Sequence, residues 1–395
     1  MNSRRMGFAL VLCLAVARVS TAAPVAEIPF HAAGSQILLP VRIASSDTLW
    51  FILDTGAEGG VVNQARAEQL GLKVTGENQS RGAGGTVTAR QLGPLDLEVG
   101  PVPMHVDHYG SIPLTGLPQR MGHVIDGIVG SELFRRYVVE IDYAAQIVRL
   151  HEPKTFDYRG HGQELPLTYT NNHPYTKARI VLSDGRKLEG RFVIDSGSSQ
   201  GIILLTEFAT RNHVSETVTK TVPVAGLGVG GEVSSKLGRL PAVELGSLRL
   251  GSPLVSLPPP VKGGQFAASG NAGNLGGAIL KKFHCYFDYS RDRLILEPVA
   301  DLDDPMPFDA SGMSLVSAGA AFDTIKVTRV IPGSPAAEAG IEPGDAIRSL
   351  DAVPAGQIGV VPLRERLRRK GETVKLEVAR GGRHWTVPLQ LRDLL

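Results

Sequence analysis

Cysteine is scarce in this 395-residue chain, which contains only Cys13 and Cys285. Cys13 lies in a leader-like segment that we expect to be removed, so one thiol remains and cannot form an internal disulfide. A catalytic role for Cys285 would need a neighbouring base, and none can be placed from the sequence. Because it sits in the strand-like stretch HCYFDY, we interpret Cys285 as a buried structural residue.

Long apolar runs are also absent beyond the N-terminus. No later segment has about 18 consecutive apolar residues, so no membrane span is expected. Residues 1–23 have the order of a cleaved secretory signal: a basic start, an apolar run over 7–16, and small residues before Pro24. Lipid attachment at Cys13 is a weaker alternative, because more apolar sequence follows it. The expected location is the periplasm or the outside of the cell.

Neither sign of charge is in excess. The leader holds three of the 41 basic residues (Arg4, Arg5 and Arg18) and no acidic one, which leaves 38 basic against 39 acidic residues and a formal charge of −1. Nothing therefore argues for nucleic acid or an anionic membrane surface as a partner. The 43% apolar and 20% charged content is that of a folded protein, and the length predicts two or three domains.

Two short stretches place a carboxylate directly after an apolar triplet. FILDTGAEGG (51–60) leads into Asp54, and FVIDSGSSQG (192–201) leads into Asp195. Ionised carboxylates are almost never fully buried without a partner. A single Asp-Thr/Ser-Gly triplet occurs in turns of many proteins, but two in the same context predict that the two carboxyl groups meet and share one proton.

The repeat extends to the elements around the triplets. Each triplet precedes an apolar strand and a helix, for which we expect Asn63 and Thr206 as N-caps. Residues 129–150 then align without a gap with residues 275–296. The triplets lie 141 residues apart and these tails 146, so each unit is one lobe of about the same size. Two such lobes can face each other across a pseudo-twofold axis.

A glycine cluster lies between the triplet and the tail of each lobe. We interpret both clusters as tips of mobile hairpins, because glycine allows backbone N–H groups to come close to a substrate. The second cluster also fits a dinucleotide-binding pattern, which we reject because no amphipathic helix follows it. The expected flap residues are Gly82, Gly84 and Gly85 in the first lobe and Gly226, Gly228 and Gly230 in the second.

Together these motifs resemble a retropepsin-like aspartic protease duplicated within one chain, over roughly residues 29–300. The resemblance rests on the two triplets, the glycine clusters and the apolar-Gly segments ending at Gly130 and Gly276. It implies an all-β fold of two lobes, 24–160 and 161–300, related by pseudo-twofold symmetry. Neither cluster contains the tyrosine of pepsin flaps, so flap contacts are not carried over.

The resemblance also implies the roles of the triplet residues. Asp54 and Asp195 would activate a water molecule and donate a proton to the scissile carbonyl, without a covalent intermediate, a cofactor or a metal ion. The hydroxyls of Thr55 and Ser196 would cross-link the two loops. Two small residues, Gly56 and Gly197, would permit the close approach of the backbones.

The two aspartates are not expected to be equivalent. Ser198 stands three residues after Asp195, where its hydroxyl could donate to the carboxylate, whereas Ala57 holds the matching place after Asp54. Hydrogen bonds to the ionised form favour it. The hypothesis is therefore that Asp195 is the ionised member and Asp54 carries the proton.

Two other candidate sites are less specific. His105 and His108 flank Asp107, but nearby prolines disfavour a helix and no third metal ligand follows. Asp126 lies close to the glycine at the end of the first apolar-Gly segment. It is either an acid that supports the dyad or a turn residue.

A change in composition over residues 301–312 predicts a solvated linker before a further domain. Residues 313–395 resemble a PDZ domain, on the pattern PGSPAA, AG and PGD within 325–352. By that topology Gly312, Met313, Ser314 and Leu315 would form the carboxylate loop, and the groove helix would run from Leu363 to Lys370. Leu363 and Leu367 would line the groove. Serine in place of the second loop glycine puts capture of a terminal carboxylate in doubt, and a packed accessory domain without a ligand is the alternative.

The sequence as a whole favours a monomeric, secreted or periplasmic aspartic endopeptidase. Its substrate would be a polypeptide, with a peptide ligand in the PDZ groove. The competing hypothesis is a peptide-binding protein that has kept the protease fold without turnover. Intact triplets favour the enzyme.

Overall fold

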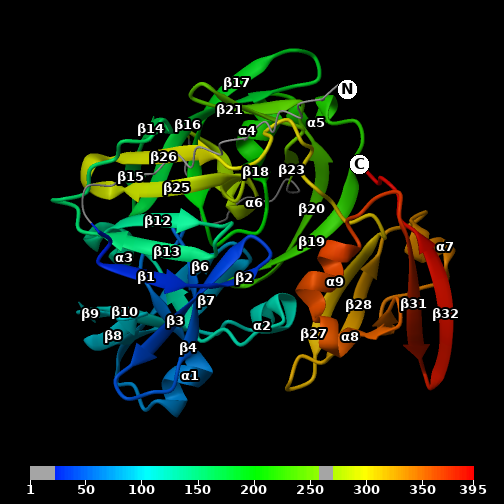
Figure 1. Cartoon of the computed structure of the whole chain (residues 1–395), viewed down its shortest axis with the longest axis horizontal. Helices are drawn as coiled ribbons and strands as arrows, with labels where there is room; N and C mark the ends of the chain where they lie inside the picture. Colours follow the sequence, from blue (N-terminus) through cyan, green and yellow to red (C-terminus); the bar gives the residue numbers. More distant parts are fainter. Residues whose placement is uncertain (1–22, 258–269) are drawn as a thin grey trace, which may run out of the picture.

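The computed structural model describes residues 23–257 and 270–395. All but the last residue of the predicted signal lies outside this range. The described chain is mostly β, as predicted, and comprises two similar lobes and a smaller third domain (Figure 1).

The first lobe is one ten-stranded sheet. Its strands follow the order β6-β7-β10-β5-β11-β4-β3-β8-β9, and β2 pairs with β3. The ten strands are β2 (His31–Ala33), β3 (Gln36–Ile43), β4 (Leu49–Leu53), β5 (Val61–Asn63), β6 (Val74–Gly82), β7 (Gly85–Leu92), β8 (Leu95–Val99), β9 (Val102–Val106), β10 (Tyr109–Ile112) and β11 (Gly127–Val129).

The second lobe repeats this topology strand for strand. Its order is β19-β20-β23-β18-β24-β17-β16-β21-β22, and β15 pairs with β16. The strands are β15 (Thr168–Thr170), β16 (His173–Val181), β17 (Lys187–Asp195), β18 (Ile202–Leu204), β19 (Val222–Gly228), β20 (Gly231–Arg239), β21 (Ala242–Leu245), β22 (Leu248–Gly251), β23 (Leu254–Leu257) and β24 (Asn271–Gly276). The predicted internal repeat is therefore a repeat of topology.

A six-stranded sheet joins the lobes in the order β1-β13-β12-β25-β26-β14. Its strands are β1 (Ala26–Pro29), β12 (Val138–Asp142), β13 (Ile147–His151), β14 (Gln163–Pro166), β25 (Phe283–Asp288) and β26 (Arg293–Pro298). At its centre β12 pairs with β25, with Glu140 opposite Tyr286. These two residues are also equivalent in the repeat, so the pseudo-twofold axis passes between them.

Short helices connect the strands of the two lobes. They are α1 (Gln64–Gln69), α2 (Leu117–Met121), α3 (Ser131–Arg136), α4 (Thr206–Arg211), α5 (Val214–Thr217), α6 (Gly277–Leu280) and the 3-10 turn η1 (Tyr289–Arg291). Asn63 is at the N-cap of α1, although its side chain makes no capping hydrogen bond. The prediction for Thr206 was wrong by one residue, because Leu205 is the N-cap of α4.

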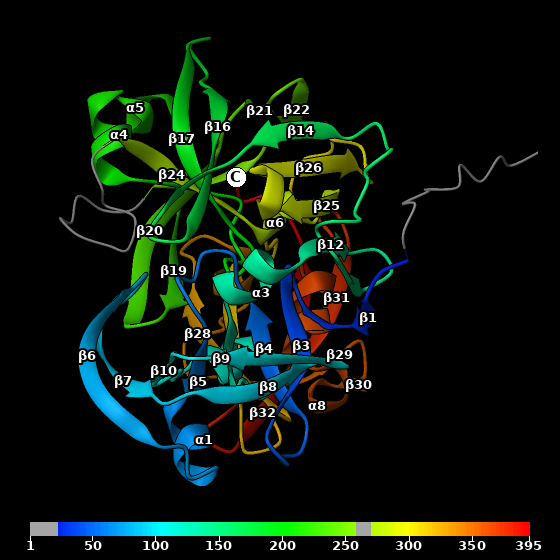
Figure 2. The same ribbon diagram turned by 90° about the vertical axis from the view of Figure 1, so that its left-hand side faces the viewer.

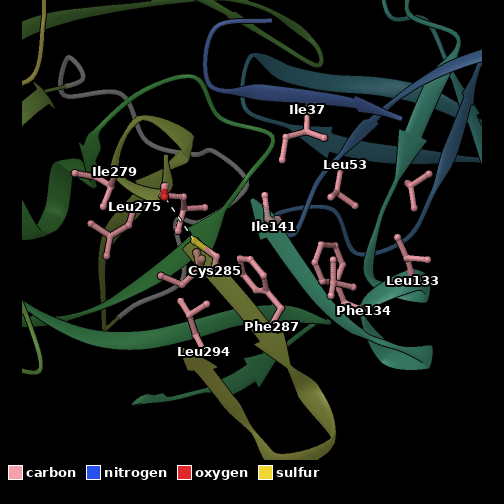
Figure 3. Packing of buried hydrophobic residues seen from close by; sticks show 14 of the residues in the cluster. Ile37, Leu53, Leu133, Phe134, Ile141, Leu275, Ile279, Cys285, Phe287 and Leu294 are labelled. Carbon is pink, nitrogen blue, oxygen red and sulfur yellow. Dashed lines mark hydrogen bonds between the residues drawn. The ribbon is translucent and has the colours of Figure 1, made fainter. Parts of the chain in front are cut away.

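One hydrophobic core runs through both lobes and the sheet between them (Figure 3). Phe134 of the first lobe meets Phe287 of the second edge to face, with ring centroids 5.3 Å apart. Cys285 is fully buried in this core, where its thiol lies 3.5 Å from the carbonyl oxygen of Leu280. Burial raises the pKa of the thiol well above its ordinary value, which agrees with a structural role.

The third domain has its own sheet and core. The sheet order is β27-β28-β29-β31-β32, with β30 paired to β29. Its elements are β27 (Met313–Ala318), β28 (Thr324–Val330), α7 (Pro335–Glu338), β29 (Ala346–Leu350), β30 (Val353–Pro354), α8 (Ala355–Ile358), α9 (Val360–Arg366), β31 (Thr373–Arg380) and β32 (Arg383–Gln390).

The segment 301–312 is not the solvated linker that its composition predicted. Met306 is buried in the core of the lobes, and Ala310 is buried in the core of the third domain. Apolar residues in this segment anchor it on both sides, one in each core. The third domain is therefore attached to the lobes through packed side chains.

Within the described residues no helix is long and apolar enough to cross a membrane.

Candidate active site

Asp54 and Asp195 stand at equivalent places in the two lobes. Asp54 directly follows β4, and Asp195 is the last residue of β17. Both strands are central in their sheets, and the apolar triplets 51–53 and 192–194 are buried. The triplets thus end two buried strands at the boundary between the lobes.

The hydroxyl residues of the triplets cross-link the two loops reciprocally. The N–H of Thr55 donates to Oγ of Ser196 over 3.0 Å, and the N–H of Ser196 donates to Oγ1 of Thr55 over 2.9 Å. Each hydroxyl then donates to the backbone of the opposite strand, at Ile194 O (2.7 Å) and Leu53 O (2.8 Å). Both side chains are fully buried, so four hydrogen bonds shielded from water fix one loop against the other.

The triplet glycines leave room for the carboxyl groups. A Cβ on Gly56 would lie 2.7 Å from Cγ of Asp195, and one on Gly197 would lie 2.3 Å from Cγ of Asp54. Any larger residue would collide with the opposite aspartate. Each carboxyl group therefore packs directly on the backbone of the other lobe.

Burial opposes ionisation of both carboxyl groups, and the charge of Asp195 further opposes that of Asp54. The pKa of Asp54 is raised well above its ordinary value, by burial first and then by the charge of Asp195. The pKa of Asp195 is also raised by burial, but hydrogen bonds from Asn274, Asp54 and the N–H of Ser198 act against the increase. This asymmetry supports the assignment of the proton to Asp54.

The physical basis of the asymmetry differs from the one expected. Nδ2 of Asn274 donates to Oδ2 of Asp195, and the N–H of Ser198 donates to Oδ1 over 2.9 Å. The hydroxyl of Ser198 instead accepts from the N–H of Gln200 over 3.3 Å. The matching position to Asn274 in the first lobe is Ile128, which has no donor. Comparison of the two repeats at this position was the signal that could have revealed Asn274.

The glycine clusters form the tips of two hairpins, β6-β7 and β19-β20, that bend toward each other (Figure 2). The N–H of Gly84 donates to the carbonyl oxygen of Val229 over 2.8 Å. A Cβ on Gly82 would lie 2.3 Å from the same oxygen, and one on Gly230 would lie 2.5 Å from the carbonyl oxygen of Gly85. The two flaps therefore meet backbone to backbone, which only glycine permits at these places.

Apolar residues of the second flap also contact the first lobe. Leu227 and Val229 pack against a buried cluster that includes Ile128 and Leu117. Leu227 lies against the backbone of Gly116: a Cβ on Gly116 would be 2.7 Å from Cδ2 of Leu227. The second flap is thus held at its tip by the first flap and along its side by the first lobe.

The two less specific candidates are placed away from this chemistry. Nδ1 of His105 pairs with Asp96 at the surface, 2.7 Å away. Nowhere in 23–257 or 270–395 do three or more His, Cys, Asp or Glu side chains gather in a way that could hold a metal ion. Asp126 is buried and accepts from Nε of Arg66 (2.7 Å) and the N–H of Trp50 (2.9 Å). It therefore links α1 to β4 within the first lobe.

The predicted groove residues of the third domain are mostly covered. Three of the four expected loop residues belong to strand β27. The helix begins at Val360 and ends at Arg366, earlier than predicted, and Leu363 and Leu367 are buried in the domain core. Gly312 has a φ of +83°, and a Cβ there would lie 2.2 Å from Ser334.

A carboxylate of the chain itself fills part of this loop. Oδ1 of Asp309 accepts from the N–H groups of Ser311 (3.0 Å), Gly312 (2.6 Å) and Met313 (3.2 Å). Burial raises the pKa of Asp309 to about 6, although these hydrogen bonds act to lower it. The sequence pattern gave no sign of this role for Asp309, because it lies in the segment whose composition predicts a linker.

Comparison with known families gives two matches. Residues 39–133 and 177–277 match the family described as Aspartyl protease, one segment in each lobe. Residues 308–379 match the PDZ domain family. No curated protein matches the chain.

Proposed function

Since the chain belongs to the retropepsin-like aspartyl proteases and ends in a PDZ domain, we propose that it is an endopeptidase that uses the Asp54/Asp195 dyad. The observation that carries it is the reciprocal cross-link of Thr55 and Ser196, which brings two buried carboxyl groups from different lobes into hydrogen-bonding contact.

In the proposed mechanism the dyad holds one proton. Asp195, ionised and stabilised by Asn274, takes a proton from a water molecule placed between the carboxyl groups. Asp54, protonated, donates its proton to the scissile carbonyl oxygen as the water oxygen bonds to the carbonyl carbon. The resulting tetrahedral intermediate breaks down when the leaving nitrogen receives a proton from the dyad. No covalent bond to the protein forms.

The flaps would complete the site around an extended substrate. Their tips present backbone N–H and C=O groups and no side chain at the glycine positions, so contact with a peptide would be independent of its sequence. Because the tips now bond to each other, substrate entry requires that they separate. Such gating fits a substrate that is a long or unfolded polypeptide.

The alternative is a peptide-binding protein with no turnover. Two intact triplets and the raised pKa values of both aspartates favour the enzyme, because a binding protein has no need of a shared proton. We further propose that the protein is monomeric and is secreted or periplasmic, on the signal-like residues 1–23. The PDZ domain would engage a peptide.

Purified protein incubated with a mixture of denatured proteins, over a range of pH, tests the proposal. Cleavage should occur and should be blocked by a statine-type inhibitor. Asp54→Asn and Asp195→Asn should each lower the rate by about 10²–10⁴-fold, because one carboxyl group cannot be both acid and base. Asp107→Asn, a surface change of the same kind, should have no effect. Cleavage that survives in both dyad variants would refute the assignment.

A further inference from the structure

The edge of the PDZ sheet is covered by a helix of the protease. Strand β27 is the outermost strand of its sheet, and exposed edge strands are where extended peptides add to a PDZ-type sheet. Helix α2 of the first lobe reaches across to this edge, between β27 and α9 (Figure 1). A Cβ on Gly122, the residue that ends α2, would lie 2.7 Å from Cγ1 of Val360 and 3.2 Å from Oγ of Ser317.

One side chain fastens the helix in place. Arg364 of α9 donates from one guanidinium nitrogen to the carbonyl oxygen of Arg120, 2.7 Å away, and from the other to the carbonyl oxygen of Leu315 in β27. It thus bonds to α2 and to the peptide-accepting strand at once. The other face of α2 is anchored in the first lobe by Leu117 and Met121.

The covered region contains polar groups that lack a suitable partner. Within the described chain, neither Arg364 nor Arg120 forms an ion pair, and both guanidinium groups bond only to carbonyl oxygens. Burial lowers the pKa of both, that of Arg364 to about 9, with the nearby Arg120 as a further cause. Oγ of Ser317 is buried at the same contact, and it has no hydrogen-bond partner there or elsewhere in the described residues. A carboxylate would satisfy a buried guanidinium far better than a carbonyl does.

We propose that residues 116–122 are the resting occupant of the PDZ groove, and that the ligand which replaces them is an extended, acidic, internal segment of polypeptide. The strand edge of β27 supplies its backbone partners, and Arg364 supplies the partner for its carboxylate. An internal segment fits better than a chain end, because Asp309 already accepts from the N–H groups where a terminal carboxylate would bind. The proposal rests on the proposed peptide-binding role of the PDZ domain.

The same helix touches the second flap. Arg120 donates to the carbonyl oxygen of Ala225 over 3.4 Å, and Leu227 lies against Gly116 at the start of α2. Glu232 of the flap also pairs with Arg329 of the PDZ domain at 3.6 Å. Displacement of α2 from the groove would therefore remove support from the flap as well.

Hydrogen exchange of the full chain carrying Asp54→Asn, so that no peptide is consumed, tests this. The probes are three pools of eight-residue random peptides: one amidated with a fixed central glutamate, one amidated with glutamine there, and one with that glutamine and a free C-terminus. The glutamate pool should slow exchange in 313–318 and speed it in 116–122 and 222–239. The concentration that produces this effect should be at least about tenfold lower for the glutamate pool than for the amidated glutamine pool. Because the readout is exchange, failure here leaves the proposed protease activity untouched.

Variants of Arg364 test whether this side chain causes the preference for glutamate. Arg364→Gln should abolish the preference for glutamate, whereas Arg364→Lys should keep it. Arg348→Gln, which removes an exposed arginine of β29, should not change it. If Arg364→Gln fails to fold, the lysine variant and the pools decide. Equal action of the glutamate and glutamine pools, stronger action of the free C-terminus, or unchanged exchange in 116–122 with every pool would overturn the proposal.

Discussion

Asn274 donates a hydrogen bond to Asp195, and no equivalent donor serves Asp54 because the matching residue is Ile128. The pseudo-twofold symmetry of the fold is thus broken by one side chain next to the dyad. A bond to the ionised form favours it, so we expect the aspartate with this donor to lose its proton first.

The first prediction concerns this hydrogen bond. Asn274→Ala should move the acidic limb of the pH–rate profile to higher pH, because Asp195 then loses a bond that lowers its pKa. Ser198→Ala should leave the limb in place, since the N–H of that residue, and not its hydroxyl, bonds to Asp195. The pH dependence of kcat/KM measures both, and a shift in the serine variant alone would contradict the structure.

The second prediction concerns the cross-link of the triplets. Thr55→Val should lower the free energy of unfolding by about 1–3 kcal/mol, because the N–H of Ser196 and the carbonyl of Ile194 lose their partner in a buried place. Thr55→Ser keeps the hydroxyl and serves as the control. Denaturant unfolding should give a double-mutant coupling with Ser196→Ala above about 0.5 kcal/mol. Additive effects would argue that the two hydroxyls act independently.

The third prediction concerns Glu140 in the central sheet. It is buried and bonds to His151 (2.7 Å), His284 (2.8 Å) and Arg149 (2.7 Å). Burial alone would raise its pKa, but these partners bring the pKa well below the ordinary value. Glu140→Gln should therefore lower the free energy of unfolding at pH 7 by about 3 kcal/mol.

The pH dependence of that difference has a definite sign. A depressed carboxyl pKa contributes stability above the ordinary value, about 4.3 for glutamate, and the contribution declines as pH falls below it. The difference in free energy of unfolding between wild type and Glu140→Gln should become smaller in acid. Glu164→Gln, which removes an exposed partner of Arg293 in the same sheet, is the control and should cost less than about 1 kcal/mol. If the difference in free energy of unfolding became larger in acid, ionised Glu140 would not be the stabilising form.

The fourth prediction concerns Asp309. Its folded pKa of about 6 lies above the unfolded value near 3.8, so its contribution to stability is present below pH 3.8 and is lost as the pH rises through 6. Hydrogen exchange of β31, in the PDZ core, should therefore show less protection at pH 7.5 than at pH 4.5. Asp309→Asn can still accept hydrogen bonds at Oδ1, and protection of β31 in this variant should not differ between the two pH values. The same pH dependence of protection in the variant would show that another group titrates.

The lobes and the meeting of the two triplets could be predicted because their signals are local and occur twice. An apolar triplet followed by Asp, a hydroxyl residue and Gly spans six residues, 51–56, and its second copy at 192–197 argues against a chance match. The central sheet could not be predicted in the same way. Its pairing of β12 with β25 joins residues about 146 positions apart, and a strand pattern does not identify its partner.

The remaining misses have two causes. Asn274 differs in type from the matching Ile128, but the hydrogen bond that it makes within the second lobe is visible only in the fold. Met306 and Asp309 lie in a stretch whose proline and acidic content is typical of a linker, and their burial depends on how two finished domains pack. The contact of α2 with the PDZ domain belongs to the same class, since neither partner carries a motif for it.

The position of Glu140 opposite Tyr286 has a consequence for how such a chain could arise. A homodimer of single lobes would have to place identical residues on its twofold axis, and two facing glutamates would repel each other in a buried sheet. A fused chain is free of that constraint, because the two sides of the axis are encoded separately. The glutamate with two histidines at the centre of this protein is therefore an arrangement that requires two different lobes, which a fused chain supplies.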